Sequence, residues 1–106
     1  MSKLKTLAGI GTAADATAAQ DAVTCDETPF APGFNVLARV NFKSATGAPV
    51  VKIQGSDDGG DTWTDLAATS GILADSFVFE VVCMPLMRAN CTTAGDTGDY
   101  AAYLEA

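Results

Sequence analysis

The sequence predicts an all-β protein, a small antiparallel β-sandwich or jelly-roll-like barrel with an extended N-terminal arm. Two observations predict this fold class. Five strand-like runs recur at intervals of roughly ten residues with turn-forming residues between them, which is typical of small sandwiches. No segment with a helical period alternates with these runs, so a parallel α/β sheet is disfavoured. We expect residues 1–33 to form the arm, with short strands, and residues 34–106 to form the sandwich domain.

Length, composition and charge limit the classes of function. A chain of 106 residues is one domain, long enough to bury a core without disulfides or a metal. Its 48% of hydrophobic residues argue against a disordered chain. A net charge of −7, with only 6 Lys and Arg, argues against binding to nucleic acid or to an anionic membrane. No apolar run could span a bilayer or resembles a signal peptide, so we expect the chain to stay where it is made.

The N-terminal third has the weakest pattern. Residues 9–21 consist mainly of Gly, Ala, Thr, Asp and Gln. A short helix over residues 13–23 is an alternative because Ala favours helices, but its apolar face would be only methyl groups. We therefore expect an extended arm here. Residues 26–33 contain two prolines and a glycine, which interrupt any regular element.

The clearest strand is expected over residues 34–43. Apolar side chains alternate there with polar ones, which predicts one buried and one solvated face; the apolar set is Phe34, Val36, Ala38, Val40 and Phe42. A hairpin is expected over residues 50–66. Val51 and Ile53 alternate with polar residues, and the turn formers of residues 55–61 follow them.

The turn of this hairpin resembles the Asp-box, S-x-D-x-G-x-T-W. Its positions are occupied by Ser56, Asp58, Gly60, Thr62 and Trp63. The resemblance implies structural turn residues, in which the Asp ties the turn together and the Trp packs beneath it. We expect Trp63 to pack inward as an anchor of the hairpin; the alternative is an exposed indole that stacks on a sugar. A single copy of the motif cannot build the sialidase propellers in which it is best known.

Two further runs complete the predicted sandwich. The run over residues 77–84 is apolar at both parities, so we expect it to be buried on both faces or covered on one face by another subunit. Residues 86–93 and 100–105 are expected to form a C-terminal hairpin. In its first strand the inward and outward residues alternate, with Met87, Ala89 and Cys91 inward and Arg88 and Asn90 outward. Tyr100 and Tyr103 differ in parity, so one of them should meet solvent or a neighbouring chain.

No residue pattern predicts an enzyme or a cofactor. The chain has no His, which excludes Ser-His and Cys-His dyads. Asp57, Asp58 and Asp61 lie within one turn, whereas the two carboxylates of a glycosidase face each other across a cleft. These three side chains offer hard oxygens to Ca²⁺, but their spacing is not that of an EF-hand. We expect no metal, and Asp side chains bonded to the turn. The three cysteines, Cys25, Cys83 and Cys91, cannot all pair within one chain, and Cys83 and Cys91 are expected to be small buried hydrophobes.

Three segments resemble small β-sandwich proteins of tailed bacteriophages: residues 51–66, residues 86–95 and residues 99–104. In that family a QGS-DG-TW hairpin precedes an R-x-N-x-T-x-A-G strand and a short closing strand. The resemblance covers roughly residues 34–106. It implies a non-enzymatic virion structural protein, most closely a capsid cement or decoration protein that stabilises the head shell by binding the major capsid protein. A carbohydrate-binding or tail- or fibre-associated module is the alternative.

The same resemblance implies a place and an assembly. The chain would be made in the host cytoplasm and would lie on the capsid surface of the virion. We expect a homo-oligomer, with a trimer preferred and a dimer as the alternative, because an oligomer would hide the second apolar parity of residues 77–84.

Overall fold

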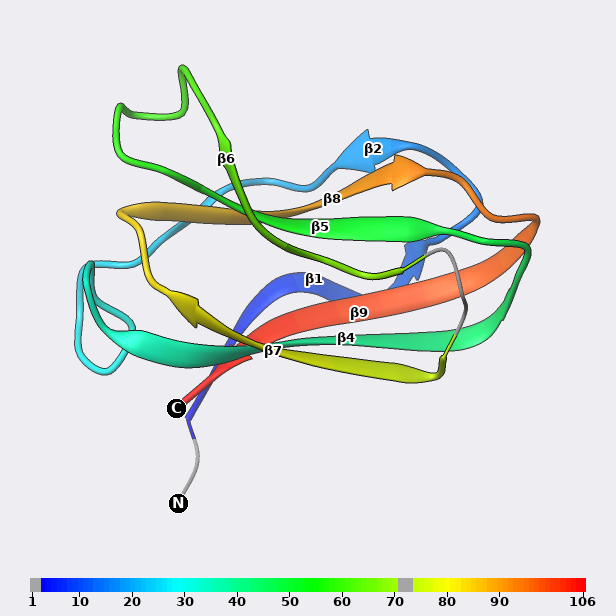
Figure 1. Cartoon of the computed structure of the whole chain (residues 1–106), viewed down its shortest axis with the longest axis horizontal. Coiled ribbons are helices and arrows are strands. Elements are labelled where there is room, and N and C mark those ends of the chain that lie inside the picture. Colours follow the sequence, from blue (N-terminus) through cyan, green and yellow to red (C-terminus); the bar gives the residue numbers. More distant parts are fainter. Residues whose placement is uncertain (1–2, 71–73) are drawn as a thin grey trace.

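The computed structural model describes residues 3–70 and 74–106 of the chain. These residues form two antiparallel sheets packed face to face, with no helix among them (Figure 1). The predicted all-β sandwich is therefore confirmed. In chain order the strands are β1 (Leu4–Ala13), β2 (Ala18–Ala19), β3 (Val23–Thr24), β4 (Asn35–Thr46), β5 (Val50–Ser56), β6 (Thr64–Ala68), β7 (Ser76–Val82), β8 (Leu86–Thr93) and β9 (Thr97–Glu105).

The chain crosses repeatedly between the two sheets. The first sheet has the order β1-β9-β4-β7, and the second has the order β2-β8-β5-β6, with β3 also paired to β8. The acidic hairpin β5–β6 thus lies at one side of the second sheet, and β7 lies at one side of the first (Figure 1). The β8–β9 connection crosses from the centre of one sheet to the centre of the other.

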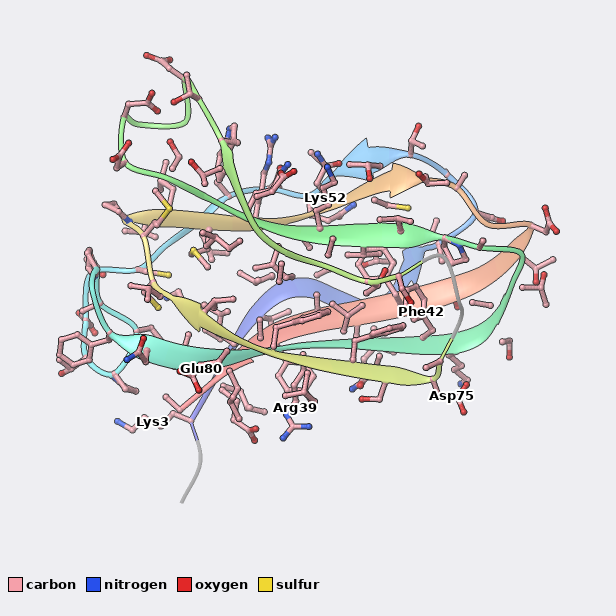
Figure 2. The ribbon with its side chains drawn as sticks, viewed as in Figure 1. Lys3, Arg39, Phe42, Lys52, Asp75 and Glu80 are labelled. Carbon is pink, nitrogen blue, oxygen red and sulfur yellow. The ribbon has the colours of Figure 1, made fainter. Side chains whose placement is uncertain are left out.

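The core lies between the sheets and follows the alternation of β4, β8 and β9. Its largest fully buried side chains include Val40, Ile53, Met87, Tyr100 and Leu104. The inward and outward positions predicted for residues 86–93 are confirmed, since every second residue from Met87 to Cys91 is buried. Figure 2 shows Phe42 pointing into the space between the sheets, whereas the labelled charged side chains of β4 and β7 point away from it. The ring of Phe42 meets the ring of Phe77 edge-on, with centroids 5.9 Å apart.

The N-terminal segment is part of the sandwich and not a separate arm, so the division at residue 33 is not reproduced. β1 is a ten-residue strand that pairs with β9, while β2 and β3 pair with β8. Leu7, Ala8, Ala14, Cys25 and Phe30 join the buried core. The prediction failed because it required large side chains for core packing. Small residues suffice here, since a methyl group fits where a strand lies close against its neighbour.

Two alternatives were expected for residues 77–84, burial on both faces or cover on one face by another subunit, and the structure does not show burial on both faces within the described chain. β7 lies at the edge of the first sheet and pairs only with β4. Its Phe77, Phe79 and Val81 face inward, whereas Val78 and Val82 are each 48% exposed on the outer face. The tyrosine prediction is confirmed: Tyr100 is buried, and Tyr103 is half-buried on the outer face.

Two backbone features constrain the sandwich. Gly98, at the start of β9, has a φ of 100° and lies directly against β4. A Cβ placed on it would be 2.5 Å from the backbone nitrogen of Ala45 and 2.6 Å from the carbonyl carbon of Ser44. At the other end of the sheet, Lys3 and Ala106 exchange backbone hydrogen bonds of 2.7 and 3.0 Å.

Candidate functional site

The acidic turn between β5 and β6 is held by its own side chains. Ser56 Oγ donates to Asp58 Oδ1 over 2.7 Å and accepts the Gly60 N–H over 3.0 Å. Asp58 Oδ1 also accepts the Thr62 N–H over 2.9 Å, and Asp58 Oδ2 accepts the Thr62 hydroxyl. Gly59 and Gly60 have φ values of 78° and 95°, which side chains with a Cβ adopt only with strain. The structure thus brings together the side chains of Ser56, Asp58 and Thr62 around one turn.

These hydrogen bonds also set the charge of the turn. Donation from the Thr62 hydroxyl, then from its backbone N–H and from Ser56, lowers the pKa of Asp58 to about 2. Asp57 and Asp61 are exposed. No group of three or more His, Cys, Asp or Glu side chains is arranged to hold a metal ion in residues 3–70 and 74–106. Both carboxylate oxygens of Asp58 are occupied by bonds within the turn, as expected for a structural residue.

Trp63 lies on the outside of the second sheet and not in the core. Its indole N–H donates to the Gly60 carbonyl over 3.0 Å, and the Arg88 guanidinium lies 4.1 Å from the centroid of the ring. The side chain is half-buried. Arg88 projects outward from β8, so the turn folds back over the outer face of the sheet and the indole closes on the turn itself. The expectation that Trp63 packs inward is therefore wrong, although the indole does anchor the hairpin.

The rest of the outer face of the second sheet is a polar network, which we call the polar face. Lys52 Nζ and Gln54 Nε2 donate to the two carboxylate oxygens of Asp65, over 2.7 and 2.8 Å. Gln54 Oε1 in turn accepts from Arg88 Nε over 2.8 Å. The bond from Lys52, then that from Gln54, lowers the pKa of Asp65. The polar side chains of this face thus satisfy one another across β6, β5 and β8.

The outer face of the first sheet is different in character. Among the described residues, the large hydrophobic side chains that are exposed belong to this sheet or to the residue before β4: Leu4, Ile10, Phe34, Val78 and Val82. Ile10 is 93% exposed. We call the outer surface of β1, β9, β4 and β7 the apolar face. It also has an ion pair, Arg39 Nε to Glu105 Oε1 at 2.7 Å, and Figure 2 shows Arg39 and Glu80 on this side.

A pocket of about 650 Å³ opens on the apolar face between β1 and β9. The register of β1 shifts twice there, between Thr6 and Ala8 and between Ala8 and Thr12. Its outer lining includes Leu4, Ile10 and Tyr103, with Lys43 and Asp99 at polar positions. Sequence reasoning missed this region because it lay in the expected arm. The available signal was Gly-Ile-Gly at residues 9–11, an apolar side chain between two flexible residues.

The cysteines are all free and buried. Burial, followed by the neighbouring Cys83, raises the pKa of Cys25 to about 11. Burial likewise raises the pKa of Cys83 and of Cys91. Such thiols stay protonated at neutral pH and are poor nucleophiles. Their burial confirms the prediction made for Cys83 and Cys91.

No family model, curated protein or solved structure matches this chain. In the ranges 3–70 and 74–106, no helix is long and apolar enough to cross a membrane.

Proposed function

We propose that this chain is a non-enzymatic virion structural protein, a capsid cement or decoration protein of a tailed bacteriophage. It would be made in the host cytoplasm, lie on the capsid surface and stabilise the head shell by binding the major capsid protein as a homo-oligomer. The resemblance of residues 51–66, 86–95 and 99–104 to phage β-sandwich proteins motivates the proposal.

The observation that carries the proposal is the contrast between the two outer faces. The polar face satisfies its side chains internally, through Lys52, Gln54, Asp65 and Arg88. The apolar face instead leaves Leu4, Ile10, Val78 and Val82 exposed on a single sheet. These side chains lie at the two edges of the sheet, on β1 and on β7, and exposed apolar surface on one face is a feature of protein interaction sites. A chain with one such face fits a role in which it is laid flat on a larger surface.

Charge supports the same role. The net charge of −7 keeps the free chain soluble and steers it toward basic patches on a shell. The apolar face also carries charged side chains, and of these Arg39 is already paired with Glu105. Docking by this face would therefore bury apolar side chains, and it would bury Arg39 together with Glu105 and not as an unpaired charge.

The carbohydrate-binding alternative depends on Trp63. A sugar platform needs an open aromatic face, and the Arg88 guanidinium lies over one face of this indole at 4.1 Å. The indole N–H is also committed to the Gly60 carbonyl. These contacts favour a structural use of the tryptophan over a sugar platform.

Capsid binding by purified variants tests the proposal. The wild-type chain should co-sediment with expanded capsids of the phage that encodes it, and capsids lacking it should release their genome at lower temperature. Ile10→Ser should keep the melting temperature, because the side chain is 93% exposed, but should weaken capsid binding. Thr64→Ser, an exposed position on the second sheet, is the matched control and should bind like the wild type. A wild-type chain that ignores capsids, or that occurs only in tails, would overturn the proposal.

A further inference from the structure

The sandwich has four outer edges, and three of them are poorly suited to accept another strand. The register of β1 shifts twice along its length. β6 has five residues and a register shift against β5, and the remaining edge is formed by β2 and β3, of two residues each. Irregular or very short edge strands are the usual protection against unwanted pairing. These three edges therefore have that protection.

β7 is the exception. It has seven residues and pairs with β4 from Asn35↔Val82 to Asn41↔Ser76 without a register shift. Its sequence, SFVFEVV, has no proline, no glycine and one charge, at Glu80. A regular apolar edge strand of this kind is a template for pairing with another chain.

The hydrogen bonds at the ends of β7 show which backbone groups are available. The Phe42 N–H donates to the Asp75 carbonyl and the Cys83 N–H donates to the Phe34 carbonyl, each over 2.8 Å. Because hydrogen-bonded residues alternate in an antiparallel ladder, odd-numbered residues of β7 face β4. The N–H and C=O groups of Ser76, Val78, Glu80 and Val82 therefore face away from the sheet. No strand in the described part of the chain pairs with that side of β7.

The side chains of β7 add apolar surface on both faces of this open edge. On the outer face, Val78 and Val82 are each 48% exposed. On the inner face, Phe77 and Phe79 are only half-buried, although they stack with centroids 6.2 Å apart and planes 10° from parallel. Backbone groups that face away from the sheet and exposed apolar side chains thus coincide on one strand.

We propose that β7 pairs antiparallel with β7 of a second copy of this chain, across a two-fold axis at Phe79, so that the two first sheets become one continuous sheet. This register uses every edge-facing residue: Ser76 lies opposite Val82 of the second copy, and Val78 lies opposite Glu80. Shifting the axis by one residue toward the C-terminus would place the two Glu80 side chains directly opposite each other, which is destabilising. Shifting it by one residue the other way would leave Val82 without a partner.

The short or irregular form of the other edges also favours a two-fold dimer. A trimer built by sheet continuation would need a second, different edge to receive β7, and the remaining edges are short or bulged. An isologous contact uses the same edge twice and closes on itself. The inference needs no capsid, so it can hold or fail independently of the proposed function.

Sedimentation of the purified chain over a range of concentrations gives the first test. The wild type should be a dimer. Val78→Pro removes one edge-facing N–H and leaves the hydrogen bonds to β4, so it should be a folded monomer with unchanged far-UV circular dichroism. Val78→Thr keeps the N–H and the β-branched shape, and as the matched control it should still dimerise. A monomeric or trimeric wild type, or a dimeric Val78→Pro, would overturn the proposal.

A charge test fixes the register and does not depend on the proline variant. Val78→Lys places a positive charge opposite Glu80 of the second copy, and Val78→Glu places a negative one there. The Lys variant should dimerise at least several-fold more tightly than the Glu variant. In a Glu80→Gln background this difference should largely disappear. Arg39, the neighbour of Val78 on β4, is present in both backgrounds, so comparing them subtracts its effect. Equal dimerisation of the two variants with Glu80 present would show that the two strands do not meet in this register.

Discussion

Replacing Gly98 with Ala should destabilise the sandwich far more than the addition of one methyl group suggests. A Cβ at this position would lie 2.5 Å from the Ala45 nitrogen, and the atoms it meets are backbone atoms that cannot rotate away. The φ of 100° adds strain of about 1 to 2 kcal/mol for a residue with a Cβ. Forcing β4 and β9 apart adds about 1 to 3 kcal/mol, as in an overpacked core. Ala also lowers the conformational entropy of the unfolded chain, which offsets about 0.4 to 1 kcal/mol of this destabilisation.

The net cost for Gly98→Ala is then about 2 to 4 kcal/mol of the free energy of unfolding. Gly59→Ala is the matched control, since Gly59 also has a positive φ, 78°, but nothing lies within 4 Å of its Cβ position. That variant should lose about 1 kcal/mol or less, from strain alone. Urea unfolding of both variants measures the difference. Since 1 kcal/mol corresponds to about 4 to 8 °C in a domain of this size, thermal melts should separate them by roughly 5 to 20 °C. Equal losses would refute the steric argument.

Three further changes test the turn and the N-terminal strand. Because the pKa of Asp58 is lowered to about 2, its carboxylate stabilises the folded state fully above roughly pH 4 and loses this effect as the pH falls toward 2. The melting temperature of the wild type should therefore fall more steeply over that pH range than the melting temperature of Asp58→Asn. Neither Ca²⁺ nor a chelator should shift the melting temperature of either protein. Trp63→Ala should cost about 2 kcal/mol in urea unfolding, roughly half the value for a fully buried aromatic, because the indole is half-buried; a loss above about 4 kcal/mol would place it in the core after all. Deletion of residues 1–13 should abolish cooperative unfolding in calorimetry, since it uncovers β9 and removes Leu7 and Ala8 from the core; a truncated chain with a wild-type transition would restore the arm hypothesis.

Strands with clear alternation were predictable from the sequence. β4 and β8 are inner strands of their sheets, and each has one buried face over most of its length. The period of two in their side chains follows from that burial. β1 gives no such signal. Its small and flexible residues have no clear alternation, so its position is determined by pairing with β9 and not by a local pattern.

The candidate surfaces were predictable only in part. The residues of the acidic turn were recognisable because their bonds are local, within Ser56 to Thr62. The position of Trp63 was not predictable, because a residue at the end of a turn can lie on either side of a sheet. Its contact with Arg88 on β8 places the indole on the outer side. The excess apolar parity of β7 was visible in the sequence. Its place at a sheet edge depends on strand order, which no local pattern contains.

The reciprocal bonds between Lys3 and Ala106 suggest a way to rewire the chain. Residues that exchange both backbone hydrogen bonds in an antiparallel pair are neighbours, with Cα atoms about 5.5 Å apart. A short linker would therefore join them, and new ends could be opened in the exposed part of the acidic turn, at Asp57 to Asp61. Such a circular permutant would keep every strand pairing while presenting its free ends beside the polar face, so that cargo attached there would extend away from the apolar face.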